Sequence, residues 1–258
     1  MQVLTPGVDL AAFVESIGTA RERVLMLDYD GTLAPFHVEP ALAVPYPDVA
    51  AMLETIVQAG RTRLVLVSGR PAQELPPLLA LTRLPEIWGA HGWERLLPDG
   101  SLVRQEPAAA AREALARGRD TLPAGAKIED KHASIAVHWR GLPAPTAASL
   151  YEQTMQAWSP LVHAGAVEVL PFDGGLELRA IGCNKQYAVK AVLSETAAGS
   201  AVAYLGDDIT DEDAFRAVRL RGLGVLVRPE LRETAADVWI RPPDELLNFL
   251  RHWCMKRQ

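Results

Sequence analysis

Cysteine is scarce in this 258-residue chain, which carries only Cys183 and Cys254. Two cysteines so far apart, in no metal-ligand spacing, argue against a disulfide framework and a zinc site. No apolar run approaches the roughly 18 residues that a membrane-spanning helix needs. Residues 1–6 also lack the basic start and apolar stretch of a secretory signal. We therefore expect a cytoplasmic protein with no membrane partner.

Basic residues are outnumbered, since 26 Lys and Arg against 32 Asp and Glu give a net charge of −6. Without a Lys/Arg stripe, this balance argues against a nucleic-acid partner. Missing motifs exclude other chemistries: there is no Walker-type loop, dinucleotide glycine fingerprint, HExxH or GxSxG. The 49% hydrophobic content is still typical of a folded globular chain. With neither a heptad pattern nor a long apolar stripe, we expect a monomer.

Three short and continuous apolar runs are present, the pattern of parallel strands that are buried on both faces of a sheet. They cover residues 23–27, 64–67 and 201–205. Helical spacing of apolar residues lies between and around them, over 47–59, 184–196, 210–220 and 244–253. Strands that alternate with helices predict the α/β class and a doubly wound parallel sheet.

The middle of the chain predicts a different arrangement, a small antiparallel sheet with two helices. The expected helices cover 107–118 and about 145–162, and the expected strands cover 126–129, 134–140 and a hairpin over 167–179 that turns at 173–175. We therefore expect an inserted α+β domain over residues 105–180, between two core segments, 1–104 and 181–258. Insertions of this kind commonly act as lids over a site that the sheet builds.

Polar residues follow each predicted core strand: Asp28 and Asp30, then Ser68, then Asp207 and Asp208. Because the carboxyl ends of parallel strands share one edge, where ligands bind, these side chains should converge. Carboxylates that lie so close repel each other, so some are protonated or bind a cation. Oxygen ligands without His or Cys select Mg²⁺, which often takes a substrate phosphate as a further ligand. The pattern predicts phosphoryl chemistry.

Simpler structural roles remain open for several of these residues. A single Asp after a strand commonly forms a turn or caps a helix. Asp211 and Asp213 would favour a helix N-terminus through the helix dipole alone, with Thr210 as the cap. Lys185 falls in the first turn of a predicted helix, where a cation opposes the dipole by roughly 0.3–1 kcal/mol. It is therefore either solvated or placed beside an anion.

Together these residues resemble the four motifs of haloacid-dehalogenase (HAD) phosphatases, in order and in spacing. The motifs are Asp28-x-Asp30-Gly31-Thr32, Ser68 after a strand, Lys185, and Gly206-Asp207-Asp208-x-x-Asp211. The insertion between the second and third motifs is similar to the type 2 cap of sugar phosphatases. Further segments are similar to the trehalose-6-phosphate phosphatase family: 27–34, 91–95, 129–131, 138–140, 176–179 and 206–212. Ala180 and Gln186 depart from that family, which usually has Pro and Gly there, so the hinge and the substrate preference could differ.

The resemblance implies a Rossmann-like HAD core and an aspartyl-phosphate mechanism. Asp28 would be the nucleophile and Asp30 the general acid and base, while Ser68 and Lys185 would hold the phosphoryl oxygens. Asp28, Asp207 and the backbone carbonyl of Asp30 would bind Mg²⁺. Asp208 or Asp211 would support the waters around the metal.

The resemblance also implies that the cap recognises the sugar. Glu129, Lys131 and Glu177 are the main candidates, and the Glu-x-Lys pattern at 129–131 favours trehalose 6-phosphate over other sugar phosphates. Further candidates for substrate binding in the cap and in the core are His138, Arg140, Arg179, Arg70, His91 and Glu94. The alternative for any one of the cap residues is an exposed strand position or a surface ion pair, which contributes little.

Other functions remain open at this point. The chain could be a phosphatase for a sucrose, mannosylglycerate or hexose phosphate, because only cap residues separate these activities. It could also be a non-catalytic regulatory module, such as a partner of a trehalose-phosphate synthase. Intact Asp28, Asp30, Lys185 and Asp207 argue against that alternative. A phosphotransferase would need a second acceptor site, for which the sequence gives no signal.

Overall fold

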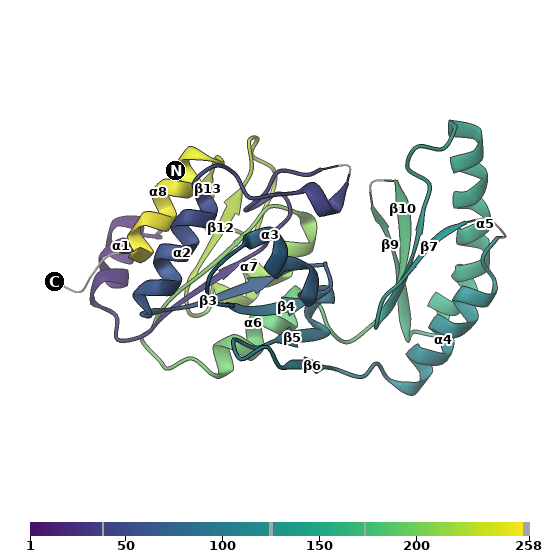
Figure 1. The fold of residues 1–258 in the computed structure, drawn as a ribbon, viewed down its shortest axis with the longest axis horizontal. Coiled ribbons are helices and arrows are strands. Elements are labelled where there is room, and N and C mark those ends of the chain that lie inside the picture. The colour runs from purple at the N-terminus through teal and green to yellow at the C-terminus, as the bar shows by residue number, and fades with distance from the viewer. Residues whose placement is uncertain (38, 124–125, 173, 255–258) are drawn as a thin grey trace. The chain divides into compact units, whose positions relative to one another are not determined.

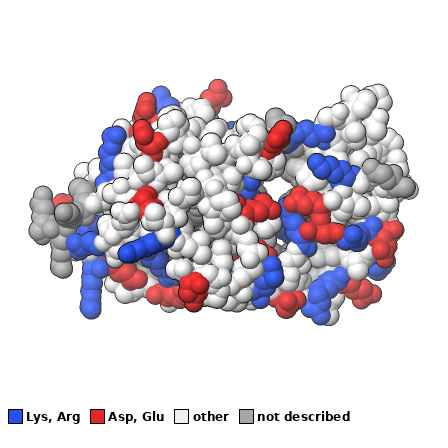
Figure 2. Space-filling model, in the orientation of Figure 1, with Lys and Arg blue, Asp and Glu red and all other residues white. Residues whose placement is uncertain are grey.

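The computed structural model describes residues 1–37, 39–123, 126–172 and 174–254 (Figure 1). The chain divides into two compact units, one made of residues 1–104 and 184–258 and the other of residues 105–183. Among the described residues, no helix is both long and apolar enough to cross a membrane. Charges of both signs are interspersed over the face shown in Figure 2.

The first unit is built on a mixed nine-stranded sheet. Its central strands run parallel, in the order β13 (Val238–Ile240), β12 (Leu223–Val227), β11 (Ala201–Gly206), β2 (Arg23–Leu27), β3 (Thr62–Val67) and β4 (Glu86–Gly89). Antiparallel strands complete the two edges: β1 (Gln2–Val3) beside β13, and β5 (Glu94–Leu96) with β6 (Leu102–Arg104) beyond β4. The predicted parallel core is confirmed. The short antiparallel edge strands carry no continuous apolar run, and the sequence did not predict them.

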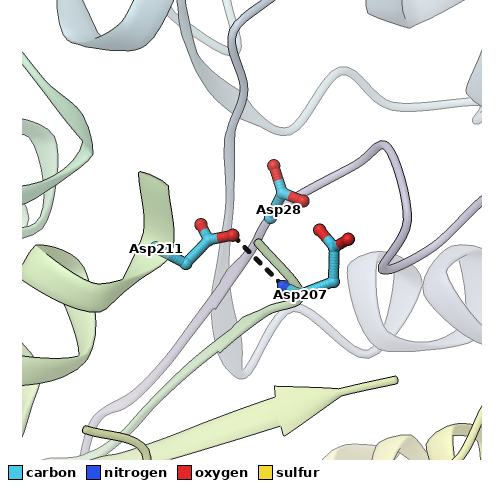
Figure 3. Close-up of side chains that lie close together, drawn as sticks. All are labelled: Asp28, Asp207 and Asp211. Atoms are coloured by element: carbon cyan, nitrogen blue, oxygen red, sulfur yellow. Dashed lines mark hydrogen bonds between the residues drawn. The ribbon is translucent and has the colours of Figure 1, made fainter. Parts of the chain in front are cut away.

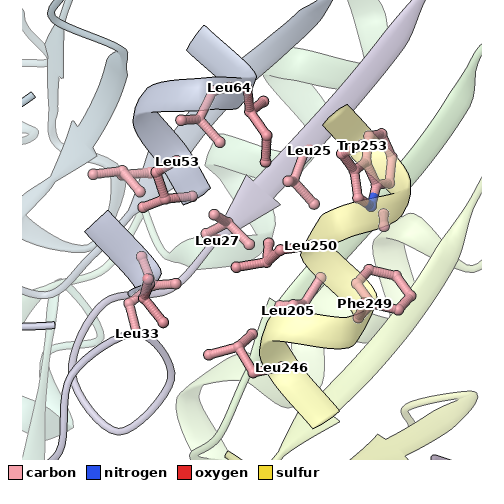
Figure 4. Close-up of a cluster of buried hydrophobic side chains, with 14 of the residues drawn as sticks. Leu25, Leu27, Leu33, Leu53, Leu64, Leu205, Leu246, Phe249, Leu250 and Trp253 are labelled. Carbon is pink, nitrogen blue, oxygen red and sulfur yellow. The ribbon is translucent and has the colours of Figure 1, made fainter. Parts of the chain in front are cut away.

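Helices cover both faces of this sheet, so the unit is doubly wound. One face packs against α1 (Leu10–Thr19), α2 (Val49–Ala59), α3 (Leu75–Leu79) and α8 (Asp244–Arg251). The other face packs against α6 (Lys185–Ser194) and α7 (Glu212–Val218). Figure 4 shows Leu25 and Leu27 of β2 beside Leu246 and Leu250 of α8. Truncating one such buried leucine to alanine lowers the free energy of unfolding by about 2–5 kcal/mol. This packing therefore holds β2, and with it the residues that follow the strand, in place.

The second unit is a four-stranded antiparallel sheet with two helices. The strand order is β7 (Lys127–Asp130), β8 (Ser134–His138), β10 (Gly175–Ala180) and β9 (Val167–Phe172). The helices α4 (Ala109–Asp120) and α5 (Ala144–His163) contact this sheet. Ile135 and Val137 of β8 pair with Leu178 and Leu176 of β10 as the buried apolar face. The turn expected at 173–175 includes Asp173, which lies outside the described residues.

Candidate active site

Three parallel strands deliver polar side chains to one edge of the large sheet. Asp28 follows β2, Ser68 follows β3 and Asp207 follows β11, as the sequence predicted. The register pairs Leu27 with both Leu66 and Leu205, so the three strands end level with one another. The Asp28 amide donates a hydrogen bond to the carbonyl of Leu205 at 2.9 Å, which carries the pairing past the end of β2.

A buried group of carboxylates lies at this edge (Figure 3). Asp28, Asp207 and Asp211 each offer an oxygen within 4.8 Å of the others. Lys185 is buried with them, and its Nζ donates to Asp28 Oδ1 and to Asp211 Oδ1, both at 2.7 Å. Two anions therefore offset the unfavourable placement of a cation in the first turn of α6. Of the two roles that the sequence left open for Lys185, the structure supports the one beside an anion.

Asp211 is a support for its neighbours. Its Oδ1 accepts from Lys185 and from the hydroxyl of Tyr204. Its Oδ2 accepts from the backbone amides of Asp207 and Asp208, at 3.1 and 3.0 Å. With four donors on two oxygens, Asp211 fixes the direction in which the chain leaves β11.

The expectation that Thr210 caps the turn in the acidic segment 207–213 is wrong. The cap of the 3₁₀ turn Ile209–Asp211 is Asp208, which forms a reciprocal capping box with Asp211. Thr210 does not have that role, because the turn begins one residue earlier than the predicted helix. Asp208 is exposed, and Asp213 forms an exposed ion pair with Arg216 at 2.7 Å. Within this segment, Asp207 and Asp211 are the acids that are buried in the carboxylate group.

Burial shapes the charge state of the group. Burial raises the pKa of Asp28 to about 7, with Lys185 opposing the shift and Asp211 adding to it. Burial and then the neighbouring carboxylates Asp28 and Asp211 raise the pKa of Asp207 to about 9. Burial disfavours the charged form of Lys185, but Asp211 and Asp28 outweigh it and raise the pKa of this amine. At neutral pH the group therefore retains protons unless a cation replaces them.

The donor set fits a divalent cation. Oδ1 of Asp207 is buried and has no hydrogen-bond partner among the described residues, which leaves it available as a ligand. Gly31 makes room for Asp207, because a Cβ at Gly31 would lie 2.1 Å from its Oδ2. The available ligands are oxygens, which hard cations prefer. Asp28 and Asp207 are the residues with oxygens placed to hold such an ion.

Asp30 lies apart from this group and is paired with Arg70. The guanidinium Nε and Nη2 each donate to one oxygen of Asp30 at 2.6 Å. Arg70 Nη1 also donates to the carbonyl of Pro40 at 2.8 Å, so the arginine is held at three points. The pKa of Arg70 is raised, mainly by the hydrogen bonds to Asp30. The sequence had assigned Arg70 to the substrate, and here its partner is the expected general acid.

Of the remaining candidates in the first unit, Ser68 and His91 lie side by side, whereas Glu94 has other partners. Ser68 is buried, and its hydroxyl accepts from the amide of Arg70 at 3.1 Å. His91 lies beside it, since its amide donates to the Ser68 carbonyl at 3.0 Å and its ring covers Gly69. Glu94 is instead used within the core, where its oxygens accept from the Ala72 amide and from Arg104. In this structure Glu94 therefore holds the Ala72 amide and Arg104, and its predicted contact with the substrate stays a prediction.

The cap candidates form a connected polar cluster on the second unit. His138 Nε2 contacts Glu129 Oε2 at 2.9 Å, and Lys131 Nζ lies 3.8 Å from Glu129 and 3.3 Å from Glu177. Ser134, which the sequence did not single out, donates its hydroxyl to Glu177 at 2.6 Å. Arg179 pairs with Glu168 of the neighbouring strand at 2.7 Å, outside this cluster. Arg140 lies just beyond the end of β8, beside Gly174.

Sequence patterns missed several residues that hold the core site in place. Thr32 donates to Asp28 Oδ2 at 3.1 Å, and Tyr204 donates to Asp211. Arg228 and Arg232 donate to the backbone carbonyl of Asp207. Thr32 stands within the first motif and Arg228 directly follows β12, so both positions could have been found. Tyr204 and Arg232 act through tertiary contacts that no local pattern shows.

Comparison with known proteins places this geometry in a family. The family described as Trehalose-phosphatase matches residues 26–236. A probable trehalose-phosphate phosphatase of Sinorhizobium fredii is 34% identical over 231 residues, which are 87% of this chain and 85% of that protein. Mycobacterial relatives match at 30–32% identity, and this chain spans 18–61% of their length.

Solved structures agree on the fold. The C-terminal domain of a Candida albicans trehalose-6-phosphate phosphatase superposes with a TM-score of 0.75 at 20% identity, over 98% of this chain and 99% of that one. The C-terminal domain of a Candida albicans trehalose synthase regulatory protein superposes with a TM-score of 0.67 at 16% identity, over 93% and 97%. The fold is thus shared with an enzyme and with a regulatory protein. By the match over residues 26–236, the chain belongs to the trehalose-phosphatase family.

Proposed function

We propose that this protein hydrolyses trehalose 6-phosphate to trehalose and phosphate, with Mg²⁺ as its cofactor. The observation that carries the proposal is the buried Asp28 carboxylate, held by Lys185 and Thr32 beside Asp207. A binding module has no need of a carboxylate buried against two others and a lysine. Membership of the trehalose-phosphatase family supports the choice of substrate.

In the first step Asp28 attacks the phosphorus, and the bond between phosphorus and the sugar oxygen breaks as the aspartyl-phosphate forms. A carboxylate is a weak nucleophile, so alignment is essential. Lys185 and Thr32 provide it, because each fixes one oxygen of Asp28. Mg²⁺, held by Asp28 and Asp207, would neutralise the repulsion between these carboxylates and the phosphate.

Asp30 supplies the proton that the departing sugar oxygen needs, and then removes a proton from the water that hydrolyses the aspartyl-phosphate. While Arg70 makes its two-point contact, both oxygens of Asp30 accept hydrogen bonds from the guanidinium. Asp30 can reach the sugar oxygen as a donor only when that contact loosens. The incoming phosphate is an alternative partner for the guanidinium, and we propose that substrate draws Arg70 away from Asp30.

Negative charge spreads over the phosphoryl oxygens during transfer, and Ser68 and Lys185 are the donors for it. Ser68 is already oriented by the Arg70 amide. Hydroxyl groups of the disaccharide both donate and accept, which suits the mixed cluster of Glu129, Lys131 and Glu177. These cap residues are the proposed sugar ligands, with His138 holding Glu129 and Ser134 holding Glu177.

The test is phosphate release from trehalose 6-phosphate, sucrose 6-phosphate, mannosylglycerate phosphate and glucose 6-phosphate, each with Mg²⁺ and with chelator. Asp28→Asn is the inactive variant, and Asp213→Asn is its matched control because Asp213 pairs only with an exposed arginine. Turnover of trehalose 6-phosphate that is lost with chelator and in Asp28→Asn supports the proposal.

Two results would overturn it in different ways. Turnover of another sugar phosphate would agree with the proposed catalytic roles but contradict the sugar-binding roles of the cap residues. The catalytic roles are those of Asp28, Asp30, Ser68 and Lys185, and the cap residues are Glu129, Lys131 and Glu177. Absence of turnover with every ester would favour the regulatory function, since a regulatory protein shares this fold. Binding of trehalose 6-phosphate without hydrolysis would then be the measurement to make.

A further inference from the structure

The backbone carbonyls of Asp207 and Asp208 accept hydrogen bonds from arginine side chains, mainly from Arg232. Arg232 Nη2 donates to the carbonyl of Asp208 at 2.7 Å and to that of Asp207 at 3.2 Å, and its Nε donates to the Asp207 carbonyl at 3.3 Å. Arg228 adds a further contact to the Asp207 carbonyl at 3.2 Å. The guanidinium thus spans two consecutive peptide groups.

These contacts direct the Asp207 side chain through its backbone. The amide of Asp207 is tied to Asp211 and its carbonyl to Arg232, so the peptide groups on both sides of its Cα are fixed. Its Oδ1 has no hydrogen-bond partner among the described residues. The direction of this oxygen therefore depends on how the backbone around Cα is held.

Arg232 is itself held in place by a second set of contacts. Its Nη1 donates to Glu212 Oε1 at the start of α7 and to the carbonyl of Glu233 at 2.8 Å. Glu212 in turn accepts from the Thr234 hydroxyl at 2.9 Å and from the Ala235 amide at 2.6 Å. Both side chains are largely buried, with 20% and 12% exposed. The segment 232–235, α7 and the end of β11 are therefore linked through a single guanidinium.

We infer that Arg232 is a positioning residue for the Asp207 carboxylate, and that Glu212 orients Arg232 for this purpose. The inference rests on the proposed function in taking Asp207 as a metal ligand. A lysine could not replace this arginine, because an ammonium lacks the planar fork that reaches two carbonyls and a carboxylate together. Groups that orient metal ligands typically contribute about 10–100-fold to metal affinity. We expect Arg232→Met to weaken divalent-metal binding by about that factor.

The experiment measures Mn²⁺ binding to the full chain without substrate, by electron paramagnetic resonance of the free ion. The variants are Arg232→Met, Arg232→Lys and Glu212→Gln. Arg216→Met is the matched control, because Arg216 belongs to the same short helix but pairs with the exposed Asp213. Melting curves by circular dichroism identify any variant that has unfolded, and Glu212→Gln then supplies the test. Mg²⁺ dependence of phosphate release is the second readout.

The expected order of Mn²⁺ affinity is wild type equal to Arg216→Met, then Glu212→Gln, then Arg232→Lys, then Arg232→Met. Half-maximal activity should need correspondingly more Mg²⁺, with kcat largely restored at saturation. Equal Mn²⁺ affinity in wild type and folded Arg232→Met would overturn the inference. A wild type that binds Mn²⁺ but hydrolyses no sugar phosphate would refute the proposed activity alone, and a wild type that binds no metal would refute both.

Discussion

Asp207 is buried beside two other carboxyl groups, and its Oδ1 has no hydrogen-bond partner among the described residues. The loss of stability that this placement causes in the metal-free protein can be measured. The folded-state pKa values of Asp28 and Asp207, about 7 and about 9, lie above the ordinary value of 3.8. The folded chain therefore binds these protons more tightly than the unfolded chain does. By linkage, the contribution of these two carboxyl groups to the free energy of unfolding is fully present below about pH 4 and is lost as pH rises towards 9.

We predict that Asp207→Asn flattens this decline and abolishes metal-dependent activity. The amide cannot ionise, so the variant avoids the cost, which grows above pH 4, of keeping Asp207 protonated in the folded state. In chelator at pH 8 its melting temperature should exceed that of the wild type, by about 2–4 °C for each kcal/mol gained. Mg²⁺ should raise the melting temperature of the wild type only. Identical pH profiles for wild type and variant would contradict the assignment, and Asp213→Asn is the control.

Arg70 leads to a second prediction at the level of single residues. Arg70→Met should lower kcat/KM for trehalose 6-phosphate by about 100-fold, within the range for losing general acid–base catalysis. The free enzyme loses the group that places Asp30, and the bound phosphate loses the guanidinium proposed to pair with it. Arg70→Lys should recover little, since lysine cannot make the two-point contact.

Steady-state kinetics of these variants tests the role of Arg70. Arg63→Met is a suitable control, because Arg63 also makes a two-donor contact to a carboxylate, Glu86, at 2.9 and 2.8 Å, and its further ion pair is with Glu195, outside the site. A loss in Arg63→Met equal to that in Arg70→Met would show that general destabilisation is the cause.

In the loop after β2, the backbone at Gly31 makes room for a side chain of the candidate metal site. Gly31 has φ +85°, and its missing Cβ leaves the space that Asp207 occupies. We predict that Gly31→Ala displaces Asp207 and raises the Mg²⁺ concentration needed for half-maximal activity by about tenfold or more. Gly100 has φ +86° with nothing within 4 Å of a Cβ.

Gly100→Ala is therefore a matched control for Gly31→Ala. Both substitutions carry the same left-handed strain of about 1–2 kcal/mol, but only Gly31→Ala introduces a clash. The measurement is the Mg²⁺ titration of activity together with thermal melting. If both variants lose stability equally and keep the wild-type Mg²⁺ response, the space at Gly31 does not serve the site.

The parallel strands were the elements easiest to predict, for a physical reason. A strand buried on both faces is almost wholly apolar, so 23–27, apolar from Val24 onwards, and 201–205 stand out in the sequence. The polar residues that follow such strands could then be placed at one edge without knowing any contact. The edge strands β5 and β6 are short and partly exposed, so their pattern is weak.

Side-chain partners could not be predicted in the same way. The pairing of Arg70 with Asp30 joins residues 40 positions apart, and the contact of Arg232 with Asp207 spans 25. Such contacts depend on the relative depth of neighbouring strands and on rotamers that the sequence pattern does not encode. Glu94 is an example, because it stands in a segment similar to the family and was predicted to bind substrate. Its contacts with the Ala72 amide and with Arg104 could not be read from that segment.

At the scale of the whole molecule, the catalytic candidates lie in one unit and the proposed sugar ligands in the other. This division predicts that cap and core variants have different kinetic signatures. Glu177→Gln should raise KM for trehalose 6-phosphate by about tenfold, because hydrogen bonds to a charged group contribute about 1.5–3 kcal/mol. The same variant should leave turnover of p-nitrophenyl phosphate unchanged, because that ester has no sugar hydroxyls.

Asp28→Asn should abolish turnover of both esters, since both need the nucleophile. Ser134→Ala should resemble Glu177→Gln in weaker form, because Ser134 holds Glu177 by a hydrogen bond of 2.6 Å. Glu152→Gln, an exposed change on α5, is the control within the cap. Parallel losses of both activities in Glu177→Gln would mean that the cap residue supports the fold or the chemistry. Specificity would then have to be sought among the core residues around His91.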